Sequence, residues 1–349
     1  GHRIRRWGVA AVVAAVGLTA ACSESKEGLK GGTNPLSGEG INNNALPTAP
    51  TAPPTPCGPE ATSATWPGGT LPGPKDPVPA GGTLEKIRNR GFLTAGIDLN
   101  TYLFGYDPHH TNQPQGFDVD IAKAMARAIF GEDGHIQFRV VTLADQKTGE
   151  AAQLRTGSVD LVVRTTTITC ARMQGDNRMS FSNPYYTAEQ KLLMPLGADG
   201  QPQSTALADL KGKGKKVCAT KNSTAIDTIK KQAGDDAAYE AANALDCLAL
   251  LQQDQVDAVF TDDALLRGMA AQDPHVAITT APPVQRQPYG IATAYDAGKP
   301  NDLTPFVNTA LANLIADTNG PNGWKTLYAH DLQTPPAGLP EIPGQYPLG

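Results

Sequence analysis

The pattern that most limits the fold of this chain is a helix–turn–strand unit that occurs twice. Residues 157–163 (GSVDLVV) and residues 254–260 (DQVDAVF) each place a polar turn and a Val-Asp pair before an apolar run. Each run leads into a polar segment, and Thr165 and Asp262 lie five residues after the Asp of their own unit. Apolar strands that alternate with helices predict parallel sheets in an α/β fold.

Two such units predict a ligand-binding cleft. Ligands of open α/β sheets bind outside the carboxyl ends of the strands, which is where both polar segments fall. Two sheet edges of this kind that face each other would enclose a ligand between them. The rest of the chain fits the alternation, with helices predicted at 84–90, 118–129 and 144–156 and strands at 91–97, 137–142 and 159–164.

The start of the chain predicts export. Three arginines precede an apolar run at 7–18, and small residues then lead to Cys22, so we expect residues 1–21 to be a secretory signal peptide. The apolar run is too short to span a bilayer as a helix, which needs about 20 residues. The residues before Cys22 resemble a bacterial lipobox, which predicts lipidation of Cys22. Thr19 departs from that box, and a plain secreted protein is the alternative.

Two segments have the composition of unfolded chain. Residues 22–82 are rich in Pro, Gly, Thr, Asn and Ser and have almost no apolar periodicity, and residues 335–349 are again rich in Pro. Such segments bury too little apolar surface to offset the entropy of ordering them. We expect the first to be a disordered tether and the second an extended tail.

Charge and cysteine content limit the kinds of partner and of covalent link that this chain can have. A net charge of -5 argues against a nucleic-acid partner, which favours a basic surface. With Cys22 lipidated, an even set remains in an oxidising compartment, and it allows three disulfide pairings: Cys57, Cys170, Cys218 and Cys247. A metal site is the competing interpretation. The chain has no CxxC motif and its six histidines are scattered, so we expect no metal and no cofactor.

An ordered set of motifs gives the chain a family resemblance. The motifs are 116–120 (GFDVD), 157–160 (GSVD), 167–172 (TITCAR), 181–186 (FSNPYY), 217–224 (VCATKNST) and 256–262 (VDAVFTD). From about residue 84 to 332 the chain thus resembles family 3 of the bacterial solute-binding proteins, the polar amino-acid receptors of ABC transporters. Its cysteines at 170 and 218 are similar to those of the actinobacterial glutamate/glutamine branch. It departs from the family pattern at Ala171, at Asn222 and in a longer segment before Phe181.

The resemblance implies a two-lobed α/β fold of the type II periplasmic-binding-protein kind, with two mostly parallel sheets joined by two hinge strands. Lobe 1 would comprise residues 83–190 and 289–334, and lobe 2 residues 191–288. Cys218 would end a strand and Cys247 would open a helix in lobe 2, which favours the pair Cys218–Cys247. The pair Cys57–Cys170 would then join the tether to lobe 1.

The resemblance also assigns the two charged ends of an amino-acid ligand. Arg172 would bind the α-carboxylate, because a guanidinium fork matches a carboxylate, and Thr167 would add a hydroxyl and an N–H. Ser223 and Thr224 would contribute N–H groups from a helix N-terminus of lobe 2. The α-ammonium group would contact the carbonyl of Thr165 and the carboxylate of Asp262. An ordinary surface role for Arg172, and Asp263 in place of Asp262, are the alternatives.

The ligand side chain is assigned less directly. Phe104 is chosen from three aromatic residues after the first strand as the wall against the ligand's aliphatic part, although such clusters also form cores. Arg164 and Lys221 are the two cations that would pair with a ligand γ-carboxylate, or they are solvated surface charges.

We therefore expect a monomeric lipoprotein on the extracytoplasmic face of the cell membrane. It would bind glutamate, aspartate, glutamine or asparagine by lobe closure and deliver it to an ABC transporter permease, without catalysis. One alternative is an amino-acid sensor that signals to a membrane receptor. The other is an enzyme on the same fold, for which Glu189 would be a candidate acid or base.

Overall fold

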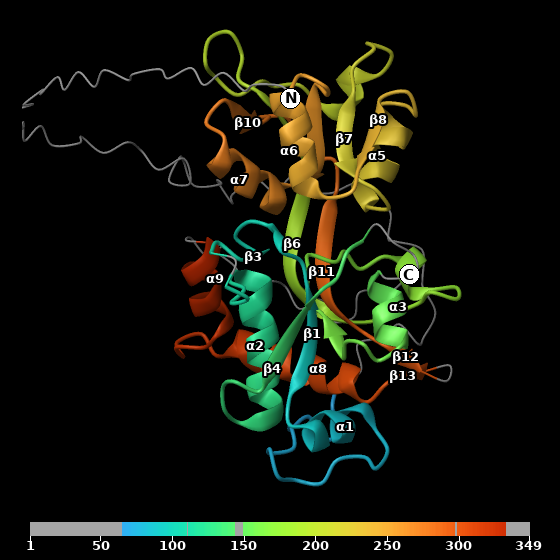
Figure 1. Ribbon diagram of the computed structural model, residues 1–349, viewed down its shortest axis with the longest axis vertical. Coiled ribbons are helices and arrows are strands. Elements are labelled where there is room, and N and C mark those ends of the chain that lie inside the picture. The colour runs from blue at the N-terminus through green and yellow to red at the C-terminus, as the bar shows by residue number, and fades with distance from the viewer. Residues whose placement is uncertain (1–64, 110, 144–148, 297–298, 333–349) are drawn as a thin grey trace, which may run out of the picture. The chain divides into compact units, whose positions relative to one another are not determined.

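The computed structural model describes residues 65–109, 111–143, 149–296 and 299–332 (Figure 1). All of them belong to one compact unit, residues 39–349. The predicted signal peptide, Cys22, Cys57 and the predicted tail at 335–349 lie outside the described residues. Among the described residues, no helix combines the length and the apolar character needed to cross a bilayer.

One mixed sheet of nine strands organises the described chain, in the order β4-β1-β5-β11-β6-β9-β7-β8 with β10 paired to β6. Its strands are β1 (Leu93–Ile97), β4 (Ile136–Val140), β5 (Leu161–Val162), β6 (Ser180–Pro195), β7 (Val217–Thr220), β8 (Ala238–Ala241), β9 (Ala258–Asp262), β10 (Val276–Ile278) and β11 (Arg286–Thr293). Two short hairpins complete the strands: β2 (Asn100–Thr101) with β3 (Gly105–Tyr106), and β12 (Tyr295–Asp296) with β13 (Lys299–Pro300).

The pairing directions divide this sheet into two lobes. Strands β4, β1 and β5 are parallel to one another, and we call the part built on them lobe 1. Strands β8, β7 and β9 are also mutually parallel and form lobe 2. The antiparallel strands β6 and β11 connect the two sets (Figure 1). The predicted α/β class, with two parallel sheets and two joining strands, is therefore confirmed.

The change of lobe can be located within β6. Its residues up to Glu189 pair with β11, whereas Gln190 to Leu193 pair with β9 of lobe 2. Gln190 has no exposed surface and bonds to Thr224 and Gln285, so this crossing point is a packed polar site and not a loose linker. The lobe boundaries expected from the sequence stay a prediction.

Helices cover both faces of each half of the sheet (Figure 1). They are α1 (Thr83–Arg90), α2 (Phe117–Phe130), α3 (Glu150–Arg155), α4 (Cys170–Met173), α5 (Thr224–Gln232), α6 (Ala244–Gln252), α7 (Asp263–Gln272), α8 (Leu303–Ala316) and α9 (Trp324–Leu332), with a 3-10 turn at Leu207–Leu210. In lobe 1 the apolar faces of α2, α8 and α9 share one core with the aromatic side chains of β6 and β11. In lobe 2, α5 packs on one face of the sheet, and α6 and α7 pack on the other.

The start of α2 depends on a glycine. Gly116 has φ = 116°, and a Cβ built there would lie 2.5 Å from the carbonyl oxygen of Phe104. The N–H groups of Phe117 and Asp118 donate to the carbonyls of Leu103 and Phe104, which satisfies the first turn of the helix. The loop after β1 is thereby held against α2.

The predicted tether is too long at its C-terminal end. Trp66, Leu71 and Val78 pack against the core of lobe 1, and the N–H of Trp66 donates to Thr309 Oγ1 at 2.9 Å. The side chain of Arg88 also donates to carbonyls at 72, 73 and 76. Isolated apolar residues in a Pro- and Gly-rich segment give no periodic signal, so composition alone assigned residues 65–82 to unfolded chain.

The two lobes are also in direct contact at α7. A Cβ built at Gly268 of α7 would lie 2.8 Å from the carbonyl oxygen of Tyr102, in the loop that follows β2. Helix α7 belongs to lobe 2 and the loop belongs to lobe 1. The absence of a side chain at position 268 therefore permits the lobes to approach this closely.

A disulfide links Cys218 of β7 to Cys247 of α6 within lobe 2, with an S–S distance of 2.03 Å and a Cα–Cα distance of 5.5 Å. Cys170, the first residue of α4, is also disulfide-bonded. The partner predicted for it, Cys57, lies outside the described residues, so this pairing stays a prediction.

Candidate functional site

A cavity of about 60 Å³ lies between the lobes, at the carboxyl ends of their parallel strands. Both lobes contribute polar side chains to it, and Leu143 and Leu265 supply apolar surface. The lining residues are Asp98, Leu143, Arg164, Thr165, Thr166, Thr167, Arg172, Thr220, Ser223, Thr224, Ala225, Ala242, Asn243, Ala244, Thr261, Asp262 and Leu265. A larger cavity of about 250 Å³ lies on lobe 1 near Arg155 and Tyr295 and contains none of these residues.

Arg172 is held at the lobe 1 side of this cavity by a short helix. Thr169 caps α4, since its hydroxyl accepts from the Arg172 N–H at 3.3 Å, and one guanidinium nitrogen donates to the carbonyl of Thr167 at 2.6 Å. Burial lowers the pKa of Arg172, but an arginine remains charged at neutral pH. The remaining guanidinium donors make this residue a candidate partner for an anion.

Asp262 lies at the opposite side of the cavity, where β9 ends and α7 begins. The hydroxyl of Tyr289 donates to its Oδ2 at 2.6 Å, whereas its Oδ1 is buried without a hydrogen-bond partner. Burial raises the pKa of Asp262 to about 7. A buried carboxylate oxygen without a donor is costly, so a cationic ligand group at this position would be stabilising.

The neighbouring Asp263 is already engaged. Its Oδ1 accepts the N–H of Glu189 at 2.8 Å, and its Oδ2 pairs with Arg267 at 3.0 Å. It is also missing from the residues that line the cavity. Of the two adjacent carboxylates, Asp262 is thus the one that faces a ligand.

Thr165 reaches the cavity in an unusual backbone conformation. Its φ is 53°, the left-handed region that is unfavourable for a β-branched residue. Its N–H lies 3.3 Å from the hydroxyl of Tyr185, which itself donates to Asp118 at 2.6 Å. Burial raises the pKa of Asp118 to about 7. This buried network stabilises the turn that presents Thr165 to the cavity.

Two helix N-termini of lobe 2 also face the cavity. Ser223 caps α5, with its hydroxyl accepting the Ile226 N–H at 3.3 Å, and Asn243 is the N-cap of α6. Asn222, just before, has φ = 61°, which an asparagine tolerates better than most residues. The Thr224 hydroxyl is bonded to the hinge residues Gln190 and Gln287, so its backbone N–H is the group left for a ligand. Such N-termini favour bound anions.

Arg164 belongs to a buried charge cluster at the wall of the cavity. Its guanidinium lies 2.7 Å from Glu150 Oε1 and 3.1 Å from Asp98 Oδ2, and its pKa is raised. Although burial opposes ionisation of Asp98, Arg164 and donors from residues 100 and 101 lower the pKa of that carboxyl. Glu150 Oε2 is buried without a partner. Two carboxylates therefore face one cation here.

The structure brings together seven of the nine residues predicted to contact a ligand: Arg164, Thr165, Thr167, Arg172, Ser223, Thr224 and Asp262. Phe104 is instead 1% exposed, in edge-to-face contact with Phe117 and Tyr186 in the core of lobe 1. Lys221 is exposed and is not among the lining residues. Arg164 lines the cavity, but its charge is already matched by the two acids.

Sequence reasoning missed Asp98 and the start of α6. Asp98 directly follows β1, so the rule that ligands bind at carboxyl ends of strands could have identified it. Asn243 followed by Asp246 forms a capping box, which is a readable helix start. Neither signal says that the residue faces a cleft, because this depends on how the lobes meet.

Comparisons with known proteins agree with this geometry. Residues 93–319 match the family model described as bacterial extracellular solute-binding proteins, family 3. A glutamine-binding protein of Geobacillus stearothermophilus is 36% identical over 212 residues, which cover 61% of this chain and 76% of that protein. The ABC transporter glutamine-binding protein of Bacillus subtilis is 35% identical over 235 residues, 67% of this chain and 80% of that protein.

A solved structure is also similar. An ancestral arginine-binding protein bound to glutamine superposes with a TM-score of 0.58 at 28% identity, covering 70% of this chain and 99% of that chain. The family resemblance read from the motifs is thereby confirmed.

Proposed function

This chain belongs to family 3 of the bacterial extracellular solute-binding proteins, and from this premise we propose that it captures an amino acid between its lobes and does not transform it. The observation that carries the proposal is one cavity lined by Arg172 from lobe 1 and Asp262 from lobe 2. The zwitterion of an α-amino acid carries the complementary pair of charges.

The carboxylate of the ligand would lie at Arg172 and the N-terminus of α5. A guanidinium offers two parallel donors to a carboxylate, and the first N–H groups of a helix attract an anion. The α-ammonium group would contact the unpartnered Oδ1 of Asp262 and the carbonyl of Thr165. Each charged end of the ligand thus meets groups whose own hydrogen-bonding capacity is not used up.

For the side chain of the ligand we propose an amide, with glutamine as the preferred substrate. Arg172 and Asp262 balance the zwitterion, which leaves Asp98 and Glu150 against Arg164, one negative charge in excess. A second ligand carboxylate would be repelled there, whereas an amide NH₂ can donate to Asp98. Two relatives named as glutamine-binding proteins, and a similar structure that holds glutamine, support this choice.

The test is a calorimetric titration of ligand-free protein with glutamine, asparagine, glutamate, aspartate and arginine. We expect glutamine to bind with a Kd in the micromolar range or tighter and glutamate about tenfold or more weakly, since one unfavourable charge contact is worth about 1.4 kcal/mol or more. Asp98→Asn is expected to lower the ratio of the Kd for glutamate to the Kd for glutamine. The exposed Glu132→Gln, which removes the same charge far from the cavity, should leave the ratio unchanged.

The possible results test amino-acid capture and the preference for an amide ligand separately. Absence of heat with every polar amino acid would overturn capture itself. Tighter binding of glutamate than of glutamine would retain capture and overturn the amide assignment.

Binding should also depend on pH. The pKa of Asp262 is about 7, so its carboxylate, the form that attracts an ammonium group, is lost as the pH falls through 7. We expect the Kd for glutamine to rise toward about tenfold per pH unit between pH 6 and 5, as for linkage to one proton. Titrations from pH 8 to 5 measure this effect.

Two variants identify the titrating group in that experiment. Asp262→Asn should bind weakly and with little pH dependence. Asp118→Asn should keep the dependence, because Asp118 also has a pKa of about 7 but does not line the cavity. A wild-type Kd that stays constant from pH 8 to 5 would exclude Asp262 as the ammonium partner.

We further propose that the receptor is held at the extracytoplasmic face of the membrane by a lipid on Cys22 and delivers its ligand to an ABC permease. The motif before Cys22 and the transporter relative support this part. Mass spectrometry of the mature N-terminus tests the anchor, and an unmodified Cys22 in protein from the native host would contradict it.

A further inference from the structure

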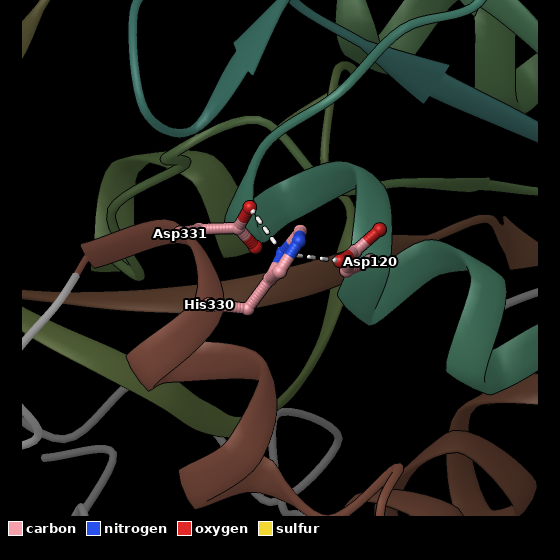
Figure 2. A group of neighbouring side chains, drawn as sticks. All are labelled: Asp120, His330 and Asp331. Atoms are coloured by element: carbon pink, nitrogen blue, oxygen red, sulfur yellow. Dashed lines mark hydrogen bonds and ion pairs between the residues drawn. The ribbon is translucent and has the colours of Figure 1, made fainter.

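Three side chains with metal-ligating atoms converge where α9 packs on α2, and none of them lines the cavity between the lobes (Figure 2). They are Asp120 from the first turn of α2, and His330 and Asp331 from the last turn of α9, which is described as far as Leu332. In the described part of the chain this is the one group of three such residues whose ligand atoms all lie within 4.8 Å of one another.

Two of the separations between these atoms match those around a bound metal ion. The Nδ1 of His330 lies 3.6 Å from Asp120 Oδ2 and 3.0 Å from Asp331 Oδ1. Ligands about 2.0–2.2 Å from a zinc ion in tetrahedral or octahedral geometry are about 3.0–3.6 Å apart. The carboxylate oxygens of Asp120 and Asp331 lie within 4.8 Å of each other.

A second observation points to a missing cation. The side chain of Asp331 is only 5% exposed, and its Oδ2 is buried without a hydrogen-bond partner. Figure 2 shows its carboxylate directed toward the imidazole of His330. A carboxylate in the last turn of a helix also interacts unfavourably with the negative end of the helix dipole, whereas a cation is stabilising there.

The surroundings leave room for a metal ion. Lys123 lies 2.9 Å from Oδ1 of Asp120, so Oδ2 remains for the metal, although the ammonium group competes electrostatically. His330 is 73% exposed, which gives solvent access and allows water to complete the coordination. Both carboxylates lie on helices packed into the lobe 1 core, which is a rigid support for a site.

We propose that Asp120, His330 and Asp331 bind a divalent transition-metal ion, zinc above all, which fastens α9 to α2. One imidazole nitrogen and two carboxylates are a ligand set suited to zinc, whereas calcium and magnesium favour oxygen ligands alone. The site is separate from the amino-acid cavity, so it stands or falls independently of the proposed function.

The test is titration of the untagged, chelator-treated protein with zinc chloride at pH 7.5, followed by calorimetry and thermal unfolding. We expect one zinc ion per chain at micromolar concentrations and a rise in Tm of about 2 °C or more at saturation. Calcium chloride at the same concentrations should produce neither effect.

Variants assign the signal to these residues. His330→Ala and Asp331→Asn should each weaken zinc binding at least about tenfold, because each removes one of three protein ligands. Lys123→Gln should tighten it about threefold by removing the competing charge. His135→Ala, at an exposed histidine beside Glu132, is the matched control and should leave the zinc affinity unchanged. Thermal unfolding of each variant without zinc serves as the check of folding.

Absence of zinc binding to the wild-type protein would overturn the proposal. Equal zinc affinity in His330→Ala and the wild type would do so as well, since the bound ion would then lie elsewhere.

Discussion

Replacement of Arg172 by alanine is expected to weaken amino-acid binding about 100-fold or more and to leave the ligand-free protein folded. Truncation of one partner of a buried, hydrogen-bonded charge pair costs about 2–5 kcal/mol of binding free energy, and 2.7 kcal/mol corresponds to about 100-fold in Kd. In the structure Arg172 donates to the Thr167 carbonyl and makes no ion pair within the set of described residues. Its loss should therefore change the Tm of ligand-free protein little.

The controls separate charge from geometry. Arg172→Lys retains the charge but not the planar fork, so its affinity should fall between those of alanine and wild type. Arg155→Ala removes an exposed arginine of lobe 1 that bonds to Asn177 and lies outside the cavity, and it should bind normally. Calorimetry measures the ligand affinity of each variant, and thermal unfolding measures its stability. If Arg172→Ala unfolds the protein without changing the affinity of the folded fraction, the residue is structural.

Replacement of Arg164 by methionine is expected to lower the free energy of unfolding by about 3–5 kcal/mol, the usual effect of removing one partner from a buried ion pair. Without the guanidinium, Glu150 and Asp98 would remain as two buried carboxylates with side chains 3% and 15% exposed. Urea unfolding measures the change. Adding Glu150→Gln to the same protein should restore part of the loss, because it removes one of the two uncompensated charges.

A surface ion pair provides the comparison for this effect. Arg127→Met breaks the pair with Asp133, whose side chain is 74% exposed, and should cost at most about 1 kcal/mol. A loss as small as that for Arg164→Met would mean that water already screens the cluster. It would also remove the electrostatic argument for an amide ligand.

The sequence predicts the ligand's charged ends better than its side-chain pocket, and the structure gives the reason. Thr165 and Asp262 lie at the ends of a repeated local strand pattern, so their place at the sheet edge is readable, whereas Arg172 is assigned by the family resemblance. Whether Arg164 is available to a ligand depends on Glu150 and Asp98, which lie 14 and 66 residues away. Such pairings arise from tertiary packing and leave no local signal.

Apolar contacts between segments distant in the sequence are equally hard to predict, as Phe104 and the segment at 65–82 show. Alternation of aromatic residues after β1 cannot distinguish a wall of the cleft from the core, and Phe104 is in the core because Gly116 allows α2 to pack against its backbone. Trp66 is one apolar residue in an irregular segment. Its partner Phe306 lies 240 positions further along the chain, with ring centroids 5.8 Å apart, so no periodicity could predict the contact.

The position of Asp262 between the two crossing strands has a thermodynamic consequence. Its backbone pairs with Gln190 of β6, and its Oδ2 accepts the Tyr289 hydroxyl of β11. Ligand binding and lobe closure are thermodynamically coupled. A bound ligand therefore stabilises the closed form by the same free energy by which closure strengthens ligand binding. A measured Kd for this protein is therefore the product of a local affinity and a conformational equilibrium. Substitutions at the crossing strands, or at Gly268 where the lobes touch, would change affinity without contacting the ligand.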